Sequence, residues 1–149
     1  GTPVGARSVD LTDTGTGTIT SDNDTATFTI NDVSVNESTG TVDFTVSLDT
    51  VLDIPVDIDV IYADGTATGG GTDYDSATDT VSFPAGSTAG QTATVAISDD
   101  TIVELDETFA ASLAVNAGTP VGARSVDLTD TGTGTITSDN DTATFTIND

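Results

Sequence analysis

Several residue types are missing from this 149-residue chain, and each absence excludes a class of chemistry. Without cysteine there can be no disulfides and no thiolate metal sites. Without histidine or lysine, the chain lacks the commonest general base and the amine that Schiff-base enzymes use. Carboxylate pairs of the kind found in glycoside hydrolases are present, but the aromatic residues that stack on sugars make up only 5% of the chain. We therefore predict a protein that is not an enzyme and has no catalytic residues.

Positive charge is almost absent as well. Arg7 and Arg124 are the only basic residues, and the formal net charge is −23. Such a chain repels nucleic acid and anionic lipid and attracts cations. Disorder would also explain the acidity, but a mean hydropathy near zero argues against it. Adaptation to high salt is compatible with a cation site. Because of this charge we expect no nucleic-acid binding. No apolar run approaches the 18 residues of a membrane span, so we also expect no membrane insertion.

The chain contains one long repeat. Residues 1–32 return letter for letter as residues 118–149, an offset of 117 residues. A period of this length suits one independent domain per repeat. We interpret the chain as part of a longer tandem array. We expect residues 25–141 to form the complete domain. Residues 1–24 would then be the last strands of a preceding identical repeat, and residues 142–149 the first strand of a following one.

Apolar and polar residues alternate in many short segments that are rich in Thr, Val and Ile. This period of two predicts β-strands with one buried face, separated by Gly, Asn and Asp turns. The alternating segments lie at residues 26–30, 41–48, 56–62, 80–83, 92–97, 109–115, 125–128 and 133–137. We predict an all-β fold, a two-sheet antiparallel immunoglobulin-like sandwich of about seven to nine strands. The Thr-Gly-Thr-Gly-Thr run would also suit a β-solenoid, but no short internal period supports that alternative.

Glutamate is rare among the 25 acidic residues, because only Glu37, Glu104 and Glu107 are not aspartate. Five segments follow one another along the chain: Val-x-Val-x-Glu37-x-x-Gly, Asp64-Gly65 to Asp73-Tyr74, Thr80-Val-Ser-Phe-Pro84-Ala-Gly, Ile97-x-Asp99-Asp100 to Glu107-x-Phe109, and Gly134-Thr-Ile-x-x-Asp139-Asn-Asp141. In these segments the chain resembles the Calx-beta domain family, which occurs in sodium/calcium exchangers, an integrin β subunit and very large bacterial surface proteins.

The resemblance implies a sandwich whose loops at one end hold Ca²⁺. The residues at matching positions are Glu37, Asp73, Asp99, Asp100, Glu104, Glu107, Asp139 and Asp141, and we include Asn140 between the last two in the predicted metal site. Ca²⁺ prefers six to eight oxygen ligands, and this chain offers oxygen. Thr101 and Leu105 stand where acid-rich members carry acids, so we expect one to three ions. The alternative is that these acids only line solvated loops. Asp64-Gly65 is read as a turn without a ligand role.

These observations predict a calcium-stabilised extender module in the stalk of a large extracellular adhesin on a bacterial surface. The expected partners are adjacent identical repeats, with possible strand pairing between chains at the ends of the fragment. Asp22 and Asp24, which copy Asp139 and Asp141, should be metal-free. Two alternatives stay open: a calcium-sensing regulatory module, and an adhesive module that binds glycan or protein. The small aromatic content argues against the second alternative.

Overall fold

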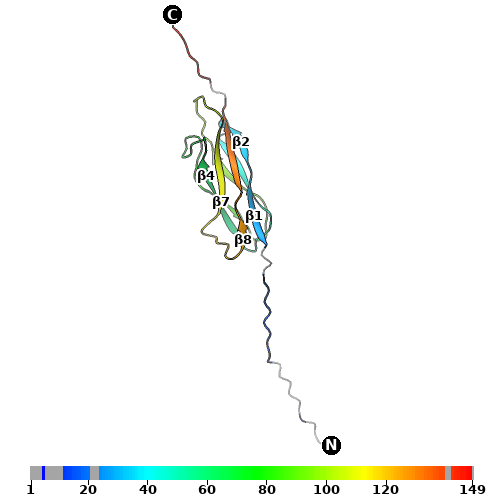
Figure 1. The fold of residues 1–149 in the computed structure, drawn as a ribbon. Coiled ribbons are helices and arrows are strands. Elements are labelled where there is room, and N and C mark those ends of the chain that lie inside the picture. The colour runs from blue at the N-terminus through cyan, green and yellow to red at the C-terminus, as the bar shows by residue number, and fades with distance from the viewer. Residues whose placement is uncertain (1–4, 6–11, 21–23, 140–141, 149) are drawn as a thin grey trace.

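The computed structural model describes residues 5, 12–20, 24–139 and 142–148 (Figure 1). Nine strands and one short 3₁₀ helix lie in this described part of the chain. They are β1 (Thr25–Ile30), β2 (Val33–Asn36), η1 (Glu37–Thr39), β3 (Thr41–Leu48), β4 (Val56–Asp64), β5 (Asp79–Phe83), β6 (Gln91–Ala96), β7 (Glu107–Val115), β8 (Ser125–Asp127) and β9 (Thr131–Thr137). The prediction of an all-β fold with seven to nine strands is confirmed.

The strands form two sheets. One sheet has the order β6-β3-β1-β8, and the other has the order β2-β9-β7-β4-β5. Most neighbours are antiparallel, as predicted, but β1 pairs with β8 and β2 pairs with β9 in parallel. The parallel pairs arise because the first and last strand segments both pass from one sheet to the other. β1 and β8 lie in the first sheet, and their continuations β2 and β9 lie side by side in the second.

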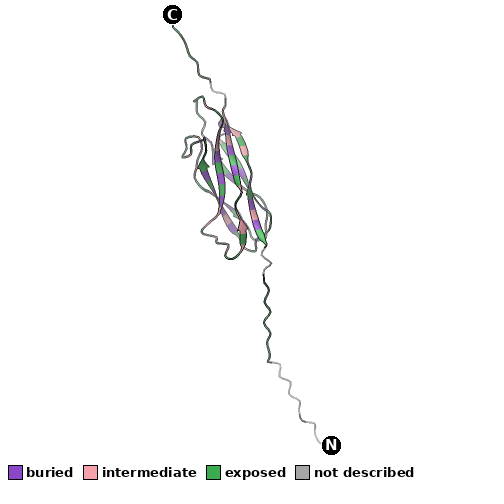
Figure 2. Ribbon diagram, viewed as in Figure 1, coloured by how far each residue is buried: buried purple, intermediate pink, exposed green. Residues whose placement is uncertain are grey.

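The core lies between the two sheets. Buried and exposed residues alternate along the strands (Figure 2). The alternation is most regular in β3, where every second residue from Val42 to Leu48 is buried. The ring of Phe109 in β7 stacks on Tyr74 with 4.2 Å between the centroids and meets Phe44 edge-on. A side chain at Gly134 would overlap the Phe109 ring. The glycines of the Thr-Gly-Thr-Gly-Thr run are thus required by packing inside a sandwich and do not mark a solenoid.

The chain enters and leaves the sandwich at opposite ends (Figure 1). We call the end where β1 begins the N-terminal pole and the end where β9 finishes the C-terminal pole. The described residues 12–20 and 142–148 form no strand and run outward from these poles, exposed. Ile19 is 99% exposed, whereas Ile136, its copy in β9, is 5% exposed. Burial of this sequence therefore depends on the rest of a domain around it.

Within the described residues, no helix has the length and the apolar character needed to cross a membrane.

Candidate metal centre

Acidic side chains from four separate parts of the chain meet at the C-terminal pole. Glu37 follows β2, and Asp73 lies in the loop between β4 and β5. Asp100 and Glu104 lie in the loop between β6 and β7, while Glu107 begins β7 itself. Asp139 lies two residues beyond the end of β9, near Glu37. Segments distant in sequence are thus brought to one end of the sandwich by the strand order.

Glu37 is held by a tight local structure. It begins the 3₁₀ turn η1, whose first N–H groups are capped by Asn36: its side-chain Oδ1 accepts a hydrogen bond from the N–H of Ser38 at 3.2 Å. Gly40 closes the turn with a φ of 78°, and its N–H donates to the carbonyl of Glu37. The Glu37 side chain is 7% exposed and is the only buried charged residue among those described. Burying a carboxylate in this way is unfavourable unless a positive charge or several donors lie near it.

Asp73 is fixed by its own backbone and by its neighbours. Its carboxylate Oδ2 accepts a hydrogen bond from the N–H of Thr68 at 2.6 Å, and its carbonyl accepts one from the N–H of Ser98 at 2.9 Å. The loop is also anchored by Asp64, whose Oδ1 accepts from the hydroxyl of Tyr74 and from the N–H of Gly69, both at 2.8 Å. Asp64 therefore positions the loop that carries Asp73, a role that the sequence analysis missed because Asp-Gly is first of all a turn signal.

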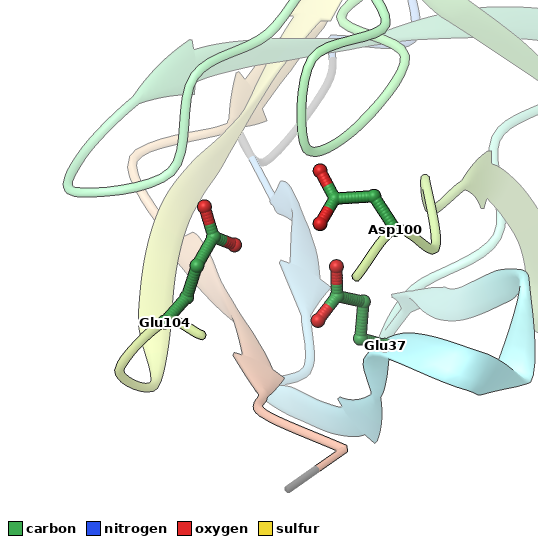
Figure 3. A group of neighbouring side chains, drawn as sticks. All are labelled: Glu37, Asp100 and Glu104. Carbon is green, nitrogen blue, oxygen red and sulfur yellow. The ribbon is translucent and has the colours of Figure 1, made fainter. Parts of the chain in front are cut away.

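Two groups of three carboxylates converge at the pole. In the first group, Glu37, Asp100 and Glu104 point toward one another (Figure 3). In the second group, Asp73 and Glu107 join the same Glu104. Within each group one carboxylate oxygen per residue lies within 4.8 Å of the others. The shared Glu104 links the two groups into one acidic centre.

The pKa values of Glu104 and Glu107 are raised, because the centre disfavours negative charge. The pKa of Glu107 is raised to about 7, chiefly by burial and further by the charge of Asp73 and a hydrogen bond between the two side chains. Burial also raises the pKa of Glu104, with further contributions from Asp100 and Asp73. Without a cation, the centre therefore favours the protonated form of both glutamates more than water does.

The pKa of Glu37 is also raised. Burial raises its pKa, and the charges of Glu104, Asp100 and Asp139 add to the effect. A hydrogen bond from the backbone of Asp100 opposes this increase without cancelling it. Asp139 is thus close enough to Glu37 to influence its ionisation. Oδ1 of Asp139 is also buried without a hydrogen-bond partner among the described residues.

The donor set fits Ca²⁺. The convergent groups offer carboxylate oxygens, which a hard divalent cation prefers. An ion would supply the partner that Oδ1 of Asp139 lacks, and its positive charge would offset both the burial and the repulsion that raise the three glutamate pKa values. Among the described residues no cation pairs with these groups, since the single ion pair found there joins Arg124 to Asp53 near the N-terminal pole.

The predicted site residues have different outcomes. The structure brings together Glu37, Asp73, Asp100, Glu104 and Glu107, with Asp139 beside Glu37. Asp99 is exposed and belongs to neither carboxylate group. Asn140 and Asp141 lie outside the described residues, as does Asp22. Asp106, which was not predicted, accepts a hydrogen bond from the N–H of Ser138 at 3.2 Å and so holds the segment that leads to Asp139.

Comparison with known proteins agrees with this geometry. The Calx-beta domain family model matches residues 20–149. The structure titled apo-form Calx CBD1 domain aligns with a TM-score of 0.65 and 22% identity over 77% of this chain and 98% of that chain. CBD12 from CALX1.2 aligns with a TM-score of 0.64 and 22% identity over 76% of this chain and 45% of that chain. The Calx CBD2 domain aligns with a TM-score of 0.60 and 14% identity over 76% and 86%.

No curated protein sequence matches the chain. At these identities the structural neighbours establish the fold, whereas the family is established by the family model, which spans most of the chain. The family is a calcium-binding domain type whose members are regulatory or structural modules. The order of strands, the acidic pole and the family match lead to one conclusion: this protein belongs to the Calx-beta domain family.

Proposed function

We propose that this domain binds Ca²⁺ at the C-terminal pole and that the ion stabilises the sandwich. The observation that carries the proposal is the pair of carboxylate groups sharing Glu104. Glu37, Asp73, Asp100, Glu104, Glu107 and Asp139 would hold the ion or ions. Because these residues come from the ends of β2 and β9 and from two loops, a bound ion would tie four segments together. Metal that binds only the folded chain adds its binding free energy to folding.

We further propose that the domain is an extender unit in a tandem array, as part of a large bacterial surface adhesin. Two observations support this role. The repeat is letter-perfect, and only residues 138–141 separate β9 from the copy of β1 that begins at Thr142. The chain also enters and leaves at opposite poles, so successive domains would lie end to end (Figure 1). The twelve residues from β1 through β2 span at most about 40 Å at a strand rise of about 3.3 Å, and each repeat would add roughly that length.

A thermal melt of the 149-residue chain tests calcium binding. In a few millimolar CaCl₂ the midpoint of unfolding should lie at least about 15 °C above that in excess EDTA, and adding EDTA to the calcium form should reverse the shift. MgCl₂ at the same concentration serves as the ionic-strength control and should give a much smaller shift. Equal melts in CaCl₂ and EDTA would refute the calcium proposal. Small-angle scattering of a three-repeat chain tests the array: a rod with a length proportional to repeat number is expected, and a compact particle would refute it.

A calcium-sensing role is the second candidate, because the structural neighbours with this fold include a chain titled calcium binding domain CBD12 of CALX1.1. A sensor must release its ion within the range over which the signal varies, whereas a structural site only needs to stay filled. Calcium titration by calorimetry separates the two candidates. Micromolar dissociation with a large change in shape favours a sensor, and an ion that changes stability without changing shape favours the extender.

A further inference from the structure

The first and last strand segments of the domain run side by side in the same direction. β1 pairs in parallel with β8 from Thr25 opposite Ser125, and β2 pairs in parallel with β9 up to Asn36 opposite Thr137. The chain therefore enters at the lower end of one member of this pair and leaves at the upper end of the other (Figure 1). A pull on the two ends of the chain moves the two segments past each other along their length.

This geometry decides how the hydrogen bonds are loaded. When two paired strands are pulled lengthwise in opposite directions, the bonds between them lie across the force and share it. When two strands are pulled apart from a common end, the bonds break one at a time. Forced unfolding is limited by the rate of crossing the barrier, so sharing the load among several bonds raises the force required.

Side-chain hydrogen bonds continue this pairing where the two sheets separate. At the end of β1 the N–H of Ile30 donates to Asp130 Oδ2 at 2.9 Å. Just beyond it, the N–H of Thr133 donates to Asp32 Oδ1 at 2.7 Å. Each aspartate thus belongs to one segment and binds the backbone of the other. The two carboxylates bridge the place where both segments change sheet and the ladder of backbone bonds is interrupted.

The two ends of the pair are reinforced as well. At the N-terminal pole the hydroxyls of Thr25 and Ser125 lie 2.9 Å apart. At the C-terminal pole Asn36 Nδ2 donates to the carbonyl of Ser138 at 3.0 Å, and the hydroxyl of Thr137 donates to the carbonyl of Val35 at 3.1 Å. All of these bonds join residues 100 to 102 positions apart in sequence. Bonding between the first and last segments therefore continues from Thr25 to Asn36.

We propose that the paired segments 25–36 and 125–138 form a load-bearing clamp, and that Asp32 and Asp130 carry it across the change of sheet. The clamp resists tension applied through the two ends of the domain. Its use in the cell rests on the proposed role as an extender, since only a module pulled through both neighbours experiences such a force. The hydrogen bonds themselves do not depend on that role.

Single-molecule pulling on the 149-residue chain tests the clamp. The chain has no cysteine, so two introduced cysteines give unique attachment points. In the first geometry, cysteines are appended to both ends. In the second, one is appended to the N-terminal end and the other is Ala123→Cys, in the exposed turn before β8, so that β1 and β8 are separated from their common end. In CaCl₂ and at equal loading rate, the first geometry should need at least about twice the force of the second. Equal or lower force in the first geometry would overturn the proposal.

The two aspartates have a matched control. D32A/D130A should lower the force of the first geometry and leave the second nearly unchanged. D43A removes a bond from the hydroxyl of Thr94 between β3 and β6, outside the clamp, and should leave the force of the first geometry unchanged. If D32A/D130A proves poorly folded, D32N/D130N retains an acceptor oxygen at both positions and should preserve the force. A force that falls equally in D32A/D130A and D43A would overturn the role of the two aspartates. Calcium-independent melting would count against the metal site and would leave the comparison of pulling geometries intact.

Discussion

Carboxyl groups at the two poles of the domain have pKa values that are shifted in opposite directions. Near the N-terminal pole, Asp53 receives two hydrogen bonds from Arg124, which is the main cause that lowers its pKa, and the N–H of Thr27 lowers the pKa of Asp49. At the C-terminal pole, burial and neighbouring carboxylates raise the pKa values of Glu37, Glu104 and Glu107. Protein donors satisfy the first set of acids. In the second set, burial and neighbouring carboxylates outweigh the one backbone hydrogen bond that Glu37 receives from Asp100, and an external cation is the partner that its geometry suits.

The largest effect that would sharpen this contrast is expected from Glu104, which both carboxylate groups share. E104Q keeps the shape of the side chain but removes one negative charge from each group. We expect it to weaken calcium binding roughly a hundredfold or more and to abolish most of the calcium-dependent rise in melting temperature. Calorimetric titration and paired melts measure both quantities. D53N at the other pole is the control and should keep wild-type affinity. Equal affinity of E104Q and wild type would remove Glu104 from the site.

A smaller effect is expected from pH, which should change the melting temperature through the acidic C-terminal pole. In EDTA, folded Glu107 binds its proton more tightly than the unfolded chain does, because its pKa rises from 4.5 to about 7. The stabilisation is therefore present below about pH 4.5 and is lost as the pH rises through about 7. Melting temperature in EDTA should fall between pH 5 and pH 8. In CaCl₂ the trend should reverse, because protons compete with the ion. A melting temperature in EDTA that rises over this range would contradict the assignment.

The smallest effect is expected at the N-terminal pole. The side chains of Arg124 and Asp53 are 35% and 76% exposed, and ion pairs of this kind contribute little to stability. D53N should lower the melting temperature by no more than about 5 °C, equally in CaCl₂ and in EDTA. High salt should reduce the difference further. A large loss that appears only with calcium would mean that the two poles are coupled.

Much of the fold could be predicted from the sequence, because alternation assigns each strand residue to the core or to solvent. Phe44 and Val46 in β3 are buried as their spacing indicates. β2 was not predicted as a strand, since four residues carry too little pattern. The parallel pairing of β2 with β9 was also missed, because alternation identifies a buried face but does not identify a neighbour. Register is decided by the whole sandwich.

The acidic pole, too, could be predicted only in part. The family resemblance pointed to Glu37, Glu104 and Glu107, which the structure brings into or beside the two carboxylate groups. It could not separate Asp99, which stays outside both groups, from the adjacent Asp100. It also overlooked Asp64, because the hydrogen bonds that make this residue useful come from the tertiary position of Tyr74. Ile19 and Ile136 make the point most plainly, since identical local sequence is exposed in one place and buried in the other.

The opposite positions of the two chain ends have a consequence for how such a protein could change over generations. Identical copies are good substrates for unequal recombination, which inserts or deletes whole repeats. If the copies are arrayed as proposed, every such event alters the length of the molecule by a fixed increment of roughly 40 Å, without requiring a new interface or a new fold. The length of the molecule would then be set by the number of copies in the gene and would change in whole repeats.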